Sequence, residues 1–175
     1  MNAIILYGSR YGASQTYAQA LEARTGIPAV AYQGIQDFGP FDTIVYIGGL
    51  YAGKTTGLAK TVRHFPADHP FRLLVATGGL SDPAVEDNLL RIRESLAQEL
   101  SPGIFVRTTH VHLRGAIDYS VLTTRHRLMM KGLCTLLHRQ PAEDRSPDTQ
   151  ALPDSYGQAA AYIDLDTLAS LPPWL

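Results

Sequence analysis

Short apolar runs recur along the chain, and most of them end at glycine or in a turn-rich stretch. A run of this length that stops at such a signal is typical of a buried β-strand. β-Branched and aromatic residues in several runs favour the same interpretation. The predicted strands cover Ala3–Tyr7, Pro28–Tyr32, Thr43–Ile47, Phe71–Ala76 and Ile104–Thr108, with an extension of the last one through His112 left open.

Helical patterns occupy the intervals between these runs. The clearest one opens at Asp82-Pro83, a favourable N-cap followed by a residue suited to the first turn. Its apolar stripe consists of Val85, Leu89, Ile92, Leu96 and Leu100. Further helices are predicted over residues 13–24, around 58–65 and over about 155–170.

Strands that alternate with helices indicate an α/β fold whose parallel sheet is covered on both faces. We expect a single domain over residues 1–175, built as a three-layer sandwich with strand order 2-1-3-4-5. Such sheets bind ligands outside the carboxyl ends of the strands, at the switch point between strands 1 and 3. The loops after strands 1, 3 and 4 are therefore the places to search for chemistry.

The loop after strand 1 carries small and hydroxyl residues and leads directly into a helix. Free backbone N–H groups at a helix N-terminus, together with Ser9 and Ser14, favour an anion such as phosphate. Gly12 would let the backbone approach that anion closely. An ordinary strand-to-helix turn with a serine cap is the alternative.

The loop after strand 3 matches the Walker A pattern over Gly48–Thr55. In a phosphate-binding P-loop, Lys54 would contact the phosphates and Thr55 a magnesium ion. Two features oppose this interpretation. Neither later strand ends in the aspartate that helps to hold the metal, and Gly57 weakens the start of the following helix. A P-loop nucleotidase is therefore the less favoured alternative.

The loop after strand 4, Thr77–Pro83, contains two glycines whose exposed backbone groups could bond the rim of a flat heterocycle. A tight turn into the next helix explains the glycines equally well. Three permissive loops at one sheet edge favour one ligand that spans them. FMN fits, with its phosphate at residues 9–14 and its ring between Tyr51 and residues 78–82.

The first loop resembles the phosphate loop of flavodoxins, usually Ser/Thr-x-Thr-Gly-x-Thr. Ser9, Gly12 and Ser14 match its first, fourth and sixth places, and Tyr11 stands where threonine is usual. Gly48–Gly53 resembles a segment of flavodoxin-domain proteins related to the menaquinone-dependent protoporphyrinogen oxidase. That group also has a basic helical insertion after strand 5, which Gly115–Tyr119 and the following Arg125–Lys131 resemble.

The resemblance implies a flavodoxin-like fold, noncovalently bound FMN and an FMN-dependent oxidoreductase of heme biosynthesis that oxidises protoporphyrinogen with a quinone acceptor. The flavin would carry the redox chemistry, so no catalytic side chain is expected. A flavodoxin-like electron-transfer protein without its own substrate is the alternative. The expected cofactor contacts are Ser9, Arg10, Tyr11, Gly12, Ala13, Ser14, Leu50, Tyr51, Ala52, Gly53, Lys54, Gly78, Gly79, Leu80, Ser81 and Asp82.

The net charge of −1 gives no global attraction to nucleic acid, so no nucleic-acid partner is expected. Residues 105–140 nevertheless hold six Lys and Arg residues against one acid, Asp118. The insertion at about 113–140 could lie on an anionic membrane or receive a redox partner, with Arg114, Arg125 and Arg127 as anion contacts. A helix packed on the sheet edge with a solvated basic face is the alternative. A connector is expected over about 140–154.

A single cysteine, Cys134, excludes an internal disulfide. His110 and His112 share one strand face, but no third ligand accompanies them, so no metal site is expected. The chain shows neither a basic leader nor about 18 consecutive apolar residues. We therefore expect a cytoplasmic setting, peripheral to the inner face of the membrane at most.

Overall fold

The computed structural model describes residues 2–51, 53–66, 71–117, 122–139, 141 and 160–175. Within these residues, five parallel strands form the central sheet in the order β2-β1-β3-β5-β6. They are β1 (Ala3–Gly8), β2 (Ala29–Ala31), β3 (Thr43–Tyr51), β5 (Arg72–Gly79) and β6 (Thr108–Arg114). Without the short β4 this is the predicted order 2-1-3-4-5, and the α/β fold class is confirmed.

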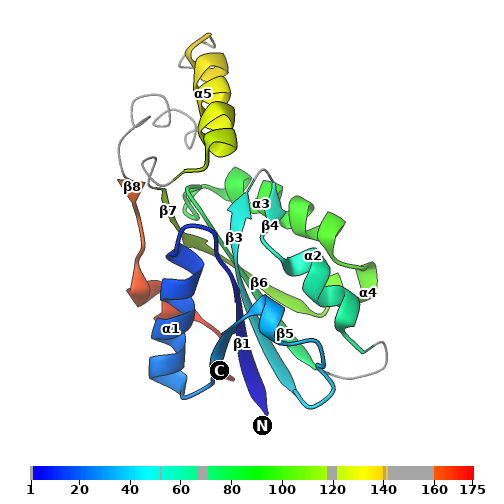
Figure 1. Cartoon of the computed structure of the whole chain (residues 1–175). Helices are drawn as coiled ribbons and strands as arrows, with labels where there is room; N and C mark the ends of the chain where they lie inside the picture. The colour runs from blue at the N-terminus through cyan, green and yellow to red at the C-terminus, as the bar shows by residue number, and fades with distance from the viewer. Residues whose placement is uncertain (1, 52, 67–70, 118–121, 140, 142–159) are drawn as a thin grey trace.

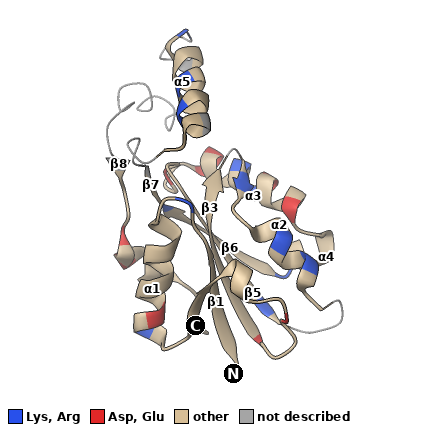
Figure 2. Ribbon diagram, viewed as in Figure 1, with Lys and Arg blue, Asp and Glu red and all other residues tan. Residues whose placement is uncertain are grey.

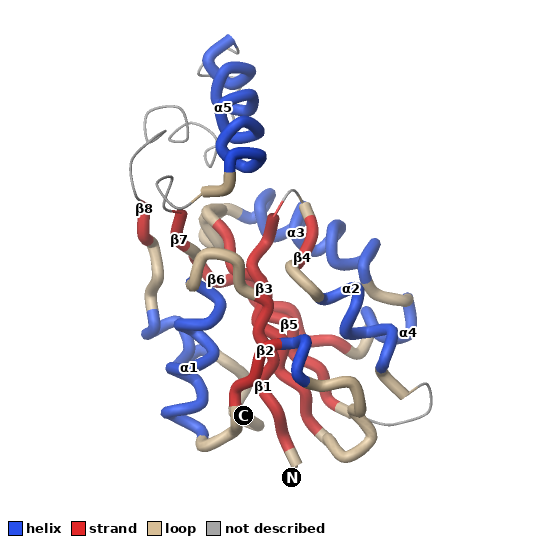
Figure 3. The backbone as a smooth tube through the Cα atoms, in the orientation of Figure 1, coloured by secondary structure: helices blue, strands red, loops and turns tan. Residues whose placement is uncertain are grey.

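Alternating side chains of the sheet supply two separate cores. On β1, Ile4 and Leu6 pack into one core and Ile5 into the other, and β3 and β5 alternate in the same way. Two helices, α2 (Leu58–Thr61) and α3 (Glu86–Glu99), cover the first core. The second core is covered by α1 (Ala13–Thr25) and by the 3₁₀ helix η4 (Leu165–Ser170). Figure 3 shows the resulting three layers.

Short elements complete the described fold. They are η1 (Tyr32–Gly34), β4 (Lys54–Thr55), η2 (Val62–His64), α4 (Pro102–Phe105), β7 (Ala116–Ile117) and β8 (Ala160–Ala161). The long helix α5 (Thr124–Arg139) extends from the end of the domain where the parallel strands have their carboxyl ends (Figure 1). The basic helical insertion predicted after the fifth strand therefore contains a helix in the expected region.

The predicted strand over Ile104–Thr108 is wrong in its position. Residues 102–105 form α4, and the strand begins at Thr108 and continues to Arg114. The carbonyl of Ser101 accepts the N–H groups of Ile104 and Phe105, which closes a helical turn that Pro102 suits at its first position. The extension through His112 was thus the correct part of the prediction.

The predicted helix over about 155–170 is wrong over residues 160–164. Ala160–Ala161 is the strand β8, antiparallel to β7, and Tyr162 N–H donates to the Gly115 carbonyl. Helical structure begins only at Leu165, as a 3₁₀ helix whose N-cap Asp164 accepts the N–H of Asp166. Residues 155–159 and the predicted connector, apart from Pro141, lie outside the described residues.

Two strands run further than the pattern predicts. β3 continues to Tyr51 and β5 to Gly79, because the glycines that looked like loop signals pair in the sheet: Gly48 with Gly8 and Thr77, and Gly49 with Gly78. Helix α3 starts later than predicted, at Glu86, with Val85 as its N-cap. Asp82 is not that cap, since its carboxylate accepts the N–H of Ala84 in a turn before the helix.

Among the described residues, no helix combines the length and the apolar character needed to cross a membrane.

Candidate functional site

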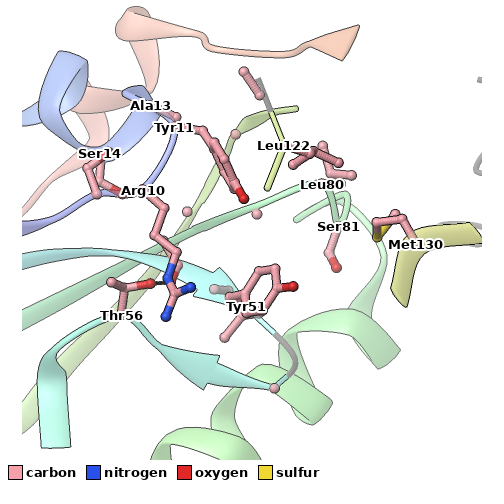
Figure 4. A pocket seen from close by; sticks show the side chains of 18 of the residues that line it. Arg10, Tyr11, Ala13, Ser14, Tyr51, Thr56, Leu80, Ser81, Leu122 and Met130 are labelled. Atoms are coloured by element: carbon pink, nitrogen blue, oxygen red, sulfur yellow. Dashed lines mark hydrogen bonds between the residues drawn. The ribbon is translucent and has the colours of Figure 1, made fainter. Parts of the chain in front are cut away.

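A cavity of about 300 Å³ lies at the carboxyl ends of β1, β3 and β5 (Figure 4). Loops after all three strands line it, and α5 contributes a further wall. This is the position that a doubly wound sheet offers to a ligand, at the switch point between its first and third strands. Among the described residues that line the cavity, Arg10 alone is charged.

The loop after β1 has the features of an anion-binding turn. Gly12 has φ +93°, a left-handed conformation that favours glycine, and its N–H donates to the Ser9 hydroxyl at 3.0 Å. Helix α1 begins at the next residue, so the N–H groups of its first turn have no acceptor within the helix. Ser14, in that turn, is 2% exposed and lines the cavity. A negatively charged group would be stabilised here.

The floor of the cavity is backbone rather than side chain. Gly49 and Gly78 pair across β3 and β5 and both line the cavity. A Cβ added to either glycine would lie about 3.5–3.7 Å from the Ser14 hydroxyl oxygen. Glycine at these positions therefore keeps open the space between the sheet edge and the first turn of α1.

The segment after β3 folds back as a hairpin, in which Leu50 pairs with Thr55 and Tyr51 with Lys54. Thr56 closes it, since its N–H and its hydroxyl both donate to the Gly49 carbonyl at 2.9 and 2.8 Å. The hairpin is fastened to α3, because the Glu99 carboxylate accepts the Thr55 N–H at 2.7 Å. The Ser95 hydroxyl also donates to the Gly53 carbonyl.

This hairpin is not a P-loop. A P-loop presents free backbone N–H groups to a phosphate and leads straight into a helix. Here the N–H groups of Thr55 and Thr56 already have partners, and residues 54–55 form a strand. Lys54 lies instead in a separate hollow, which Glu94 and Glu99 also line. The Walker A match therefore reflects a hairpin that happens to share the pattern.

The loop after β5 supplies the third side of the cavity, with Gly78, Gly79, Leu80 and Ser81. A buried imidazole lies beneath it. Nε2 of His112 donates to the Ser81 carbonyl at 3.2 Å, and Nδ1 lies 2.8 Å from the Thr77 hydroxyl. This network fixes the conformation of the loop from below.

The first turn of α5 reaches across the cavity mouth. His126 is 8% exposed, and its ring bonds Arg10 and Tyr11 of the first loop. The same ring lies 4.3 Å from the ring of Tyr51, whose hydroxyl is 3.6 Å from the sulfur of Met129. Arg10 extends towards Tyr51, with its guanidinium carbon 5.1 Å from the ring centroid (Figure 4). Residues that are distant in the sequence thus meet at one place.

Apolar side chains from the insertion form one wall of the cavity. They are Leu122, Met129, Met130 and Leu133. Two further leucines of α5 are exposed: Leu128, on a different side of the helix, is 71% exposed, and Leu136, which continues the side of Met129 and Leu133 beyond the cavity, is 61% exposed. Figure 2 shows Lys and Arg on this helix, and its sequence contains no acidic residue. The helix therefore combines a cavity-lining apolar part with exposed apolar and basic residues.

Most of the expected cofactor contacts come together in the cavity lining. These are Ser9, Arg10, Tyr11, Ala13, Ser14, Leu50, Tyr51, Gly53, Gly78, Gly79, Leu80 and Ser81. Gly12, Lys54 and Asp82 lie outside that lining, and Ala52 lies outside the described residues. The pattern analysis missed Gly49, Thr56, Gly115, Ala116, Leu122, Met129, Met130 and Leu133, which also line the cavity. Met129 and Leu133 could have been noticed, because with Leu136 they form an apolar stripe at helical spacing in the insertion.

The three arginines expected to contact an anion lie in different surroundings. Arg114 lies 3.9 Å from the Asp82 carboxylate and 4.2 Å from the Tyr162 ring centroid, outside the cavity lining. Arg127 is exposed on α5. Arg125 belongs to the same helix, but its side chain is outside what the structure describes.

The two strand histidines have separate roles. His112 supports the loop after β5, whereas the ring of His110 packs against Phe105 at 4.7 Å between centroids. Burial lowers the pKa of His110, because desolvation penalises its charged form. Within the described part of the chain, no group of three or more potential metal ligands is found.

The fold and the cavity together define a doubly wound α/β protein whose cavity lies at the switch point of the sheet, with the N-terminus of α1 at one end of it. A family model described as a flavodoxin domain matches residues 4–143, and the chain belongs to this family. Flavodoxin domains typically bind FMN. No curated protein sequence matches the chain.

Proposed function

We propose that this chain binds FMN noncovalently in the cavity and acts as an FMN-dependent oxidoreductase. The observation that carries this proposal is that one cavity is lined both by the loop at the N-terminus of α1 and by glycine backbone that faces aromatic and apolar side chains. A ligand with a phosphate tail and a planar ring matches both parts. The cavity is also within the size range of small-molecule sites.

The residues present fit the cofactor. Ser9, Ser14 and the first N–H groups of α1 would hold the phosphate, with Arg10 adding a positive charge nearby. The ring would lie between Tyr51 and the backbone of Gly78–Ser81. When bound, FMN supplies the electron or hydride transfer, and the protein supplies position and electrostatics. No side-chain nucleophile is required.

The apolar wall favours an enzyme over a simple electron carrier. A carrier needs only an accessible ring edge, whereas this site places Leu122, Met130 and Leu133 against the same cavity. Such a wall suits the apolar surface of a tetrapyrrole or of a quinone ring. We therefore propose a substrate of the porphyrinogen type and a quinone acceptor, in line with the family resemblance noted in the sequence. Basic residues of the insertion, Arg125 and Arg127 among them, would attract carboxylates of the substrate.

The first experiment is an absorbance spectrum of the purified protein before and after FMN is added and excess is removed. A retained flavin band supports the proposal, and a protein that retains none contradicts it. Ser14→Ala should weaken FMN binding about 10–100-fold, the range for a hydrogen bond to a charged group. Ser170→Ala is the matched control, because that exposed hydroxyl bonds only locally, to the Thr167 carbonyl.

A second assay separates enzyme from carrier. FMN-loaded protein is mixed with a porphyrinogen and a quinone, and porphyrin formation is followed by fluorescence without other proteins. Catalytic turnover that Met130→Asn lowers while the flavin stays bound supports the enzyme. The absence of turnover, with FMN retained and rapidly exchanging electrons with a redox protein, favours the carrier.

A further inference from the structure

Among the described residues, the first two turns of α5 make side-chain contacts with the loops after β1 and β3. Figure 1 shows the rest of the helix extending beyond the body of the domain. Its exposed apolar residues, among them Leu128 and Leu136, do not pack on the sheet layers. The contacts of residues 124–130 therefore link the cavity wall that α5 supplies to those two loops.

His126 concentrates those contacts. It is buried, and its two ring nitrogens bond two residues of the loop after β1: Nε2 lies 3.1 Å from a guanidinium nitrogen of Arg10, and Nδ1 bonds the Tyr11 hydroxyl. Arginine can only donate, so Nε2 accepts and Nδ1–H donates to the Tyr11 oxygen. The imidazole is thus fixed as one neutral tautomer with both nitrogens engaged.

The third partner of His126 comes from a different loop. Its ring centroid lies 4.3 Å from that of Tyr51, on the β3–β4 hairpin. One side chain of α5 therefore touches both the anion-binding turn and the hairpin that would flank a flat ligand. Arg10, Tyr11 and Tyr51 all line the cavity.

We propose that His126 is a positioning residue that holds α5 closed over the ligand cavity. It acts through Arg10, Tyr11 and Tyr51, and its loss frees the wall formed by Met129, Met130 and Leu133. The holding action is a property of the chain itself. That the enclosed ligand is FMN rests on the proposed function.

Cys134 reports on this closure. It is the only cysteine of the chain, is 4% exposed, and follows Met130 by one helical turn on the same side of α5. The first test is the rate at which FMN-free protein reacts with the thiol reagent DTNB at one fixed pH. Each rate is divided by that of the same variant unfolded in guanidinium chloride, which removes local effects on the thiol.

His126→Ala should react about tenfold faster or more, since tenfold corresponds to 1.4 kcal/mol, about the net worth of one hydrogen bond. His126→Gln keeps an acceptor for Arg10, so its normalised rate should lie between those of the unaltered protein and His126→Ala. Tyr11→Phe, which removes only the hydroxyl partner of Nδ1, should accelerate the reaction in folded protein.

His138→Ala is the matched control, because that ring bonds the Cys134 carbonyl within α5 itself. Its normalised rate should stay within about twofold of that of the unaltered protein. Equal rates for His126→Ala and the unaltered protein would overturn the proposal.

The second arm adds FMN. Saturating FMN should slow the reaction of Cys134 with DTNB in the unaltered protein. It should slow the reaction much less in His126→Ala, because α5 no longer closes over the ligand in that variant. Equal slowing in the unaltered protein and in His126→Ala would overturn the link between the position of α5 and the bound ligand. If no FMN is retained, the proposed function fails, while the comparison in FMN-free protein still decides whether His126 holds α5.

Discussion

Gly8→Ala tests how tightly the hairpin is seated on the end of β1. Gly8 is the last residue of β1 and pairs with Gly48. A Cβ at this position would lie 2.0 Å from the Thr56 carbonyl oxygen and 3.0 Å from the Tyr46 hydroxyl. Close carbon–oxygen contacts in proteins are about 3.3–3.6 Å. The backbone at Thr56 must therefore move by more than about 1 Å.

That movement has two energetic consequences. Inserting a methyl group into a packed region costs about 1–3 kcal/mol. The Tyr46 hydroxyl, which donates to the Thr56 carbonyl at 2.7 Å, also loses its acceptor, and an unsatisfied buried group costs about 1–3 kcal/mol more. We expect Gly8→Ala to lower the free energy of unfolding by about 2–6 kcal/mol in total.

The measurement is urea denaturation followed by circular dichroism, in FMN-free protein. Gly34→Ala is the control, because nothing lies within 4 Å of its added Cβ, and its effect should stay within about 0.5 kcal/mol. Retention of FMN should also fall in Gly8→Ala, since Thr56 lines the cavity. A Gly8→Ala protein as stable as the control would refute the described seating of the hairpin.

Three further predictions test other parts of the molecule. Burial raises the pKa of Tyr46 above its ordinary value of about 10. Its contribution to the free energy of unfolding is therefore fully present below about pH 10 and falls as the pH rises above that value, because the unfolded chain loses the proton first. Tyr46→Phe should reduce this fall in urea titrations between about pH 8 and 11. Lys54→Ala should change FMN affinity, measured by equilibrium dialysis, by no more than about twofold. Neither the variant nor the unaltered protein should show measurable Mg-ATP binding. A tenfold loss of FMN affinity would contradict the placement of Lys54 outside the cavity. We propose that the exposed apolar and basic residues of α5 bind anionic lipid. The protein should co-sediment with vesicles that contain anionic lipid, and the double variant Leu128→Asn with Leu136→Asn should abolish this binding. Equal binding to neutral vesicles would contradict the role of the basic residues.

The sheet could be predicted because its signal is local. Every central strand buries both faces, so the apolar runs at Ala3–Gly8 and Thr43–Ile47 stand out without tertiary information. The strand at 104–108 failed for the same reason, since Ile104 and Phe105 are apolar but belong to a helical turn that partly buries them against the core. An apolar run of four or five residues does not distinguish the two structures.

The cavity floor could be predicted only in part. Gly78 and Gly79 were expected at a ligand site and do line the cavity, whereas Gly49 lines it without having been expected there; the pattern placed all three in loops rather than in the sheet. A local pattern cannot reveal that glycine pairs with glycine on a neighbouring strand. The same limit explains the Walker A match, which depends on whether residues 54–55 start a helix or return along β3.

The cavity wall formed by α5, and the position of that helix, depend on contacts between residues that are far apart in the sequence. His126 lies 116 residues after Arg10 and 115 after Tyr11, so no spacing rule connects them. In the sequence, Tyr11 stands where flavodoxins usually carry a threonine. In the structure its hydroxyl bonds His126. Tyr11, at a position where the family usually has threonine, and the insertion are therefore parts of one arrangement, in which the loop after β1 provides an attachment point for α5.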